Sequence, residues 1–187
     1  KRLHIEKLPA VQKFAKANRL DKVGFKNKNA KIGIISAGKS WLDMTHALEI
    51  LGIDESKAAE FRISTYKIGM VWPIEPEGLI KWSGGLSKII IVEEKRKLIE
   101  GQVKEIFFNR PDKPAVIGGT DELGKNLFQS HYALEPIAVA LVLGEKIFAL
   151  TRSPLVKKKI NVLTQIRCGE TNAPVPARTP YFCAGCP

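Results

Sequence analysis

Three short apolar runs between Lys31 and Val92 set the hydrophobic pattern of this chain. They are KIGIIS from residue 31, RISTYKIG from residue 62 and KIIIV from residue 88, each followed by a polar cluster, and PAVI from residue 114 predicts a fourth strand. Helical patterns separate these runs, which predicts crossover connections and a parallel sheet. We therefore expect a three-layer α/β/α domain with a mostly parallel sheet over residues 31–150.

The first helix of this domain is predicted to start at about Ser40. Ser40 and Asp43 have the S-x-x-D spacing of a capping box, and Gly52 is placed to end the helix. The buried stripe is Trp41, Met44, Leu48 and Leu51. Further helical segments are predicted after Pro76, over 95–108 and over 136–143.

The flanks differ from this pattern. Residues 1–30 are predicted to be the tail of a preceding domain, with a helix over 8–20 and a polar linker over 21–30. From about Leu150 the pattern dissolves, so residues 151–180 are predicted to be a connector that includes a proline-rich stretch. Residues 181–187 resemble the start of a further domain, and we expect a longer polypeptide.

The net charge of +11 adds little to the picture, because the basic residues are scattered and only Lys157–Lys159 form a tight run. Aromatic residues make up 7% of the chain and do not alternate with basic ones, which argues against nucleic acid as a partner. The charge instead indicates a solvated basic face of a larger assembly. Three cysteines fit a reducing cytoplasm, and no apolar run approaches the roughly 20 residues of a membrane span.

The segment from Gly33 to Ser40 fits the phosphate-loop pattern G-x-x-x-x-G-K-S. A phosphate loop needs its first glycine beyond the strand, whereas Gly33 falls inside the predicted strand. The sequence therefore disfavours nucleotide hydrolysis. A weaker prediction remains, that Gly38, Lys39 and Ser40 hold an anion or a carboxylate at the start of the helix.

Glu93 follows the third strand at the carboxyl edge of the sheet, where ligands of open α/β sheets gather. Two interpretations stay open: a carboxylate that orients a neighbouring subunit or cofactor, or an acid placed favourably near the first turn of a helix. Trp72 is interpreted as an interface or core anchor. His4, His46 and His131 have no partner at metal-ligand spacing.

The C-x-x-C pair Cys183 and Cys186 is the metal signal in the chain. Two thiolates at this spacing suit one edge of a zinc ion or an iron–sulfur cluster, which needs four ligands. Cys168 is a poor third ligand, because it lies fifteen residues upstream in a different context.

In combination, GIISAGKSWLD, LGID, YKIGMVWPIEP, IVEEKRKLIEGQVKE and RTPYFCAGCP resemble the indolepyruvate ferredoxin oxidoreductase family, in its long fused form. The resemblance implies that the central domain is transketolase C-terminal-like. It implies a place between two thiamine diphosphate-binding domains, the second of which would open at residues 181–187.

The resemblance also implies the chemistry of the whole protein. Thiamine diphosphate with Mg²⁺ would decarboxylate an aryl pyruvate, [4Fe-4S] clusters would carry electrons to ferredoxin, and coenzyme A would take the acyl group. Cys183 and Cys186 would supply two cluster ligands. The central domain would act as a scaffold and interface within a homodimer and would be inactive alone. The alternatives are a phosphate-loop enzyme and a stand-alone flavodoxin-like binding module.

Overall fold

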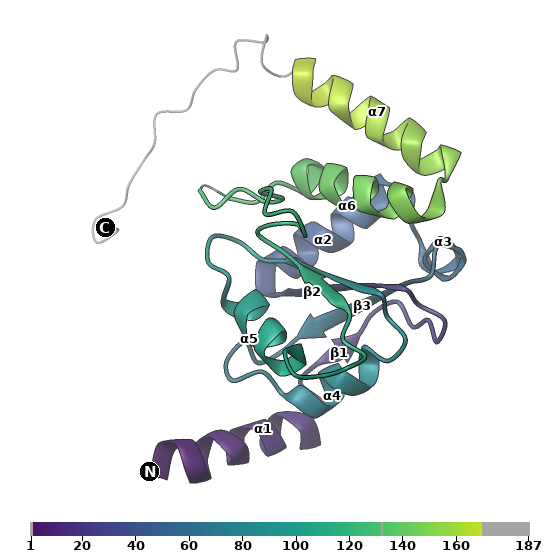
Figure 1. Cartoon of the computed structure of the whole chain (residues 1–187). Coiled ribbons are helices and arrows are strands. Elements are labelled where there is room, and N and C mark those ends of the chain that lie inside the picture. Colours follow the sequence, from purple (N-terminus) through teal and green to yellow (C-terminus); the bar gives the residue numbers. More distant parts are fainter. Residues whose placement is uncertain (1, 132, 170–187) are drawn as a thin grey trace, which may run out of the picture.

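The computed structural model describes residues 2–131 and 133–169, and they contain a five-stranded sheet in the order β1-β3-β2-β4-β5. The four strands β2 to β5 are parallel, and β1 pairs antiparallel with β3 at one edge (Figure 1). The strands are β1 Lys22–Val23, β2 Ile32–Ala37, β3 Ile63–Ile68, β4 Lys88–Val92 and β5 Ala115–Ile117. The predicted parallel sheet is confirmed, because all four expected strands form and pair as expected.

Helices cover both faces of the sheet, which confirms the three-layer prediction (Figure 1). On one face lie α2 (Gly38–Ile50) and α6 (Pro136–Thr151), with α7 (Pro154–Gly169) packed outside α6. On the other face lie α4 (Pro76–Trp82) and α5 (Leu98–Phe107).

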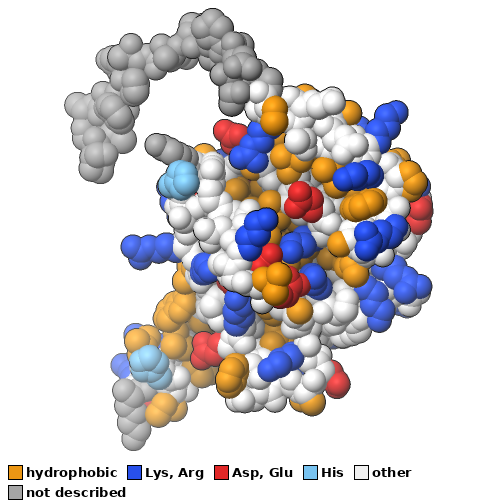
Figure 2. Space-filling view, turned by 45° about the horizontal axis from the view of Figure 1, so that its top comes forward, with side chains coloured by type: hydrophobic (Ala, Val, Ile, Leu, Met, Phe, Trp, Pro, Cys, Tyr) orange, Lys and Arg blue, Asp and Glu red, His pale blue; other side chains and the backbone are white. Residues whose placement is uncertain are grey.

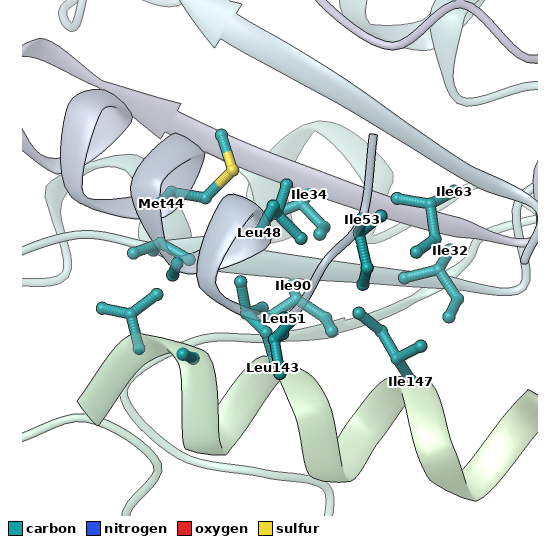
Figure 3. Close-up of a cluster of buried hydrophobic side chains, with 14 of the residues drawn as sticks. Ile32, Ile34, Met44, Leu48, Leu51, Ile53, Ile63, Ile90, Leu143 and Ile147 are labelled. Atoms are coloured by element: carbon teal, nitrogen blue, oxygen red, sulfur yellow. The ribbon is translucent and has the colours of Figure 1, made fainter. Parts of the chain in front are cut away.

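The core on the α2 and α6 face illustrates why these runs become strands. Ile32 and Ile34 alternate along β2 and face the helices, together with Ile90 of β4. Figure 3 shows Leu143 and Ile147 of α6 pointing toward this layer. All five side chains are at most 1% exposed, as expected for a sheet covered on both faces.

Helix α7 contradicts the expectation that regular structure dissolves from about Leu150. It runs for 16 residues, and Val156, Ile160 and Leu163 are buried against the core. Helix α6 also extends past its predicted end at Leu143 to Thr151. Gly144 allows the close approach of the two helices, because a Cβ there would lie 3.0 Å from Ile160 Cγ1.

The N-terminal segment forms a short π-helix, Leu3–Lys7, and then α1, Leu8–Ala17, which confirms the predicted helix. Helix α1 is attached to the domain through Gln12, whose side-chain amide donates to the carbonyl of Ile74 at 2.8 Å. The segment predicted to be a linker contains β1, so it contributes the edge of the sheet.

The start of α2 differs from the predicted capping box. The helix begins at Gly38 after Ala37, and no side chain caps it. Asp43 pairs with Lys39, one turn away on the same helix, so its carboxylate is not available to complete a capping box. A short helix that the sequence did not predict, α3 (Glu55–Glu60), is capped by the Asp54 side chain. Within the described ranges, every helix is too short or too polar to cross a membrane.

Candidate functional site at the carboxyl edge of the sheet

The strand order changes direction at β2. The chain leaves β2 for β3 on one side and then returns to form β4 on the other side. In open α/β sheets, ligands bind outside the carboxyl ends of the strands at such a switch point. The residues that follow β2 and β4 therefore define the candidate site.

Lys39, Asp43, Glu94 and the backbone of Leu134 form a polar cluster here, which we call the latch. The Lys39 ammonium donates to Asp43 Oδ2 at 2.6 Å and to the Leu134 carbonyl at 3.4 Å. Glu94 Oε2 lies 3.7 Å from Lys39 Nζ and accepts the Leu134 N–H at 3.3 Å. The latch thus ties the segment after β5 to the carboxyl ends of β2 and β4.

The latch determines what Lys39 can do. The hydrogen bond to Asp43 raises the pKa of Lys39, with a further contribution from the charge of Glu94, so the amine stays protonated. Its charge is balanced by two carboxylates of the same chain. The predicted anion contact at Gly38, Lys39 and Ser40 would therefore have to compete with Asp43 and Glu94.

Glu93 caps helix α5 from outside the helix. Its Oε2 accepts the Ile99 N–H at 2.8 Å and its Oε1 accepts the Glu100 N–H at 3.0 Å. Burial raises the pKa of Glu93, although these backbone N–H groups act in the opposite direction. The helix begins at Leu98, later than predicted, after Lys95 with φ +65°. These contacts agree with the interpretation of Glu93 as an acid placed at the first turn of a helix. A role of Glu93 toward another subunit or a cofactor stays a prediction.

Glu100 is a site residue that the sequence analysis missed. Its side chain is 1% exposed, pairs with Lys104 and accepts the Gly119 N–H at 2.7 Å. A Cβ on Gly118 would lie 2.5 Å from Glu100 Oε2, so the glycine makes room for the carboxylate. The signal in the sequence was the Gly118–Gly119 pair after β5, which permits such a close approach.

A cavity of about 490 Å³ lies beside the latch, between the segments after β4 and β5 and helices α6 and α7. Part of its lining is apolar and part is cationic. The apolar residues are Leu127, Phe128, Leu134, Ala138 and Val142, and the cationic ones are Lys95, Arg96, Lys97 and Arg167. The cavity was not predicted, because its walls come from four separate segments.

The phosphate-loop geometry does not form. Gly33 lies inside β2, as the sequence analysis placed it, and pairs with Ser64 and Ile89 on either side. A Cβ at Gly33 would lie 2.6 Å from both Trp82 and Leu86, so the glycine serves packing. Strand β2 ends at Ala37 and α2 begins at Gly38, whose φ is +53°, so no loop separates the strand from the helix.

The metal prediction falls on Cys183 and Cys186, so the described residues do not test it. His46 lies 3.4 Å from Glu49 on α2, and among residues 2–131 and 133–169 no three His, Cys, Asp or Glu side chains are grouped to hold a metal ion. Cys168 is exposed near the end of α7. Cys183, Cys186 and the proline-rich stretch lie outside the described residues.

Trp72 is 55% exposed, so the interpretation as a core anchor is wrong. Val71 and Leu98 are also exposed, and Gln102 joins their backbones by donating to both carbonyls at 2.9 Å. We refer to these three exposed apolar side chains, whose segments Gln102 holds together, as the exposed patch. Figure 2 shows Lys and Arg scattered over the face in view, in agreement with the charge pattern of the sequence.

Comparison with known proteins places the chain in a family. The model described as "Indolepyruvate oxidoreductase domain" matches residues 22–170. The indolepyruvate oxidoreductase subunit IorA of Thermococcus kodakarensis is 31% identical over 164 residues, which cover 86% of this chain and 22% of that protein. The subunit of the same name from Methanothermobacter marburgensis is 26% identical over 187 residues, covering 98% of this chain and 25% of that protein.

Two solved structures overlap with parts of the fold. A split-gene transketolase, an inactive β4 tetramer, has a TM-score of 0.45 at 14% identity, covering 70% of this chain and 42% of its own. The 2-oxoglutarate:ferredoxin oxidoreductase from Magnetococcus marinus has a TM-score of 0.43 at 18% identity. The match covers 75% of this chain and 23% of the oxidoreductase chain.

The described geometry and the family match cover the same part of the molecule. The match begins at β1 and ends at the end of α7, so it includes every strand and both cavity-lining helices. The chain spans between a fifth and a quarter of the length of the curated relatives named above. This chain belongs to the indolepyruvate oxidoreductase domain family.

Proposed function

We propose that this chain is the transketolase C-terminal-like scaffold and interface domain of a cytoplasmic 2-oxoacid oxidoreductase. The whole protein would decarboxylate an aryl pyruvate with thiamine diphosphate and Mg²⁺ and pass electrons through [4Fe-4S] clusters to ferredoxin. Coenzyme A would accept the acyl group. The observation that carries this proposal is the family match over residues 22–170.

The carboxyl edge of the sheet does not fit a thiamine diphosphate site. Its Mg²⁺ would need carboxylate or carbonyl oxygens that are free to coordinate. At the carboxyl edge, Asp43 and Glu94 bind Lys39, and both oxygens of Glu93 accept backbone N–H groups. We therefore assign the cofactor sites to other parts of the polypeptide, with Cys183 and Cys186 as two cluster ligands.

An interface role is supported by the exposed patch of Val71, Trp72 and Leu98. Large apolar side chains grouped on a surface mark sites of protein contact. Gln102 fixes the patch, since it also accepts the Ile74 N–H at 3.0 Å. We assign this patch to contact with another part of the oxidoreductase or with a second copy of the chain.

The proposal is tested with the complete gene product, purified without oxygen together with its partner subunit. Indolepyruvate, phenylpyruvate and 2-oxoglutarate are compared as substrates, with reduction of ferredoxin as the measurement. We expect reduction that requires thiamine diphosphate and coenzyme A and is fastest with an aryl substrate. A preparation that contains thiamine diphosphate and [4Fe-4S] clusters but reduces ferredoxin with none of these 2-oxoacids would contradict the proposal.

A further inference from the structure

We propose that the cavity beside the latch binds a small organic anion with an apolar body, such as an aryl or acyl carboxylate. This inference does not rest on the proposed function, because it uses only the lining of the cavity. Its volume of about 490 Å³ lies within the range of small-molecule sites, about 300–1,000 Å³. Two opposite kinds of wall meet in it.

The cationic wall lacks compensating acids. Within the described residues, Arg96, Lys97 and Arg167 make no ion pair, although they come from two segments far apart in the sequence. Lys95 lies 3.7 Å from Glu94. The acid that lines the cavity, Glu93, is committed to two backbone N–H groups. An anion would therefore meet the guanidinium groups of Arg96 and Arg167 and the ammonium of Lys97, none of which is neutralised by a carboxylate of the described residues, and such groups form strong charge-assisted hydrogen bonds.

The position of Lys97 is fixed by its neighbours. Its ammonium donates to Thr120 Oγ1 at 3.4 Å. A Cβ at Gly119 would lie 2.4 Å from Lys97 Cε, so the missing side chain lets the lysine lie across the segment after β5. The lysine stem is thereby held along the rim of the cavity.

The apolar wall is part of the core. Phe128 and Leu134 are 7% and 2% exposed, and Ala138 and Val142 come from α6. The latch holds Leu134 in place through both its carbonyl and its N–H. A ligand with only a charge would leave this wall in contact with water, so the site favours an anion that also carries an apolar group.

The test is calorimetric titration of the polypeptide that the gene encodes with three matched probes. 4-Phenylbutyrate carries both charge and apolar body, 4-phenylbutan-1-ol lacks the charge, and acetate lacks the body. We expect 4-phenylbutyrate to bind, and 4-phenylbutan-1-ol and acetate each to bind at least about tenfold more weakly. Equal affinity for the alcohol, or no binding of 4-phenylbutyrate at millimolar concentration, would overturn the proposal.

Variants locate the binding. Arg96→Gln with Lys97→Gln should weaken 4-phenylbutyrate at least about tenfold. The matched control, Lys28→Gln with Arg62→Gln, also removes one lysine and one arginine, but at the opposite edge of the sheet. It should change the affinity for 4-phenylbutyrate less than about twofold. An equal loss in both double variants would show non-specific attraction and would sink the site. Ala138→Phe, which fills the apolar wall, should abolish binding while the far-UV circular dichroism stays unchanged.

Discussion

Both edges of the sheet carry charged residues but use them differently. At the carboxyl edge, Glu93 caps α5 and Glu100 holds the segment after β5. At the amino edge, Lys31, Arg62 and Arg152 line a cavity of about 500 Å³ whose acid, Glu60, pairs with Lys57 instead. Carboxylates therefore hold segments together at the carboxyl edge. The amino edge is held by backbone hydrogen bonds and by uncharged or cationic side chains, such as Lys31, whose ammonium donates to the Gly85 carbonyl at 3.2 Å.

The backbone at the amino edge shows this directly. Arg62 and Arg152 have left-handed conformations, with φ +57° and +53°. The Arg62 carbonyl accepts the Lys31 N–H at 2.7 Å, and the Arg152 N–H donates to Phe148. Their side chains are exposed and take no part in these bonds. Substitution of Arg62 or Arg152 should therefore matter less than substitution of the carboxylates at the other edge.

Helix α7 connects the two edges, since Pro154 lines the amino-edge cavity and Arg167 the carboxyl-edge cavity. Loosening it should have the largest effect. Ile160→Ala should lower the free energy of unfolding by about 3 kcal/mol, because a 7% exposed side chain leaves a hole against α6. Urea unfolding measures this. Ile166→Ala, at a 44% exposed position of the same helix, should cost below about 1 kcal/mol. Equal costs would mean that α7 is not part of the folded core.

Glu100→Ala tests the carboxyl edge itself. This substitution should lower the free energy of unfolding by about 2 kcal/mol, because the buried Gly119 N–H loses its acceptor. Glu105→Ala removes an exposed acid from the same helix and should change stability by less than about 0.5 kcal/mol. Hydrogen exchange at the Gly119 amide should become faster in the first variant alone. Unchanged exchange would show that Glu100 does not hold this segment.

Glu93→Ala should cost about 1 kcal/mol at neutral pH through loss of the α5 cap. It should also change the pH dependence. Because burial raises the pKa of Glu93 above its ordinary 4.5, the folded state binds the proton more tightly than the unfolded state. The contribution of that proton to stability is full below pH 4.5 and is lost as the pH rises through the folded pKa. Stability of the variant should therefore fall less with rising pH, and an identical slope would contradict this reasoning.

The smallest effect is expected at the amino edge. Arg62→Gln should change the free energy of unfolding by less than about 0.5 kcal/mol, because the Arg62 side chain is exposed and forms no hydrogen bond or ion pair with the described residues. Thermal unfolding at low and high salt would measure it. A loss comparable to that of Glu93→Ala would remove the distinction between the two edges.

Much of the fold could be predicted from the sequence, because short stretches of apolar and polar residues specify most of the strands and helices. Lys88–Val92 is an uninterrupted apolar run and became β4 with the predicted bounds. Helix α7 was not predicted because Lys157–Lys159 separate Val156 from Ile160 and Leu163, so its apolar stripe is narrow. The start of α2 was placed two residues late, since Ser40 and Asp43 match a capping pattern although Asp43 binds Lys39.

The candidate site divides in the same way. Sequence patterns predict that polar clusters follow β2 and β4, that Gly33 lies within a strand, and that Glu93 stands at the carboxyl edge. They do not predict which groups these side chains contact, because Lys39 and Leu134 are 95 residues apart and Glu94 and Leu134 are 40 apart. Local hydrophobic and polar patterns predict which side chains are buried and which lie in loops. Contacts between distant segments depend on how helices and strands pack, which no short stretch of sequence specifies.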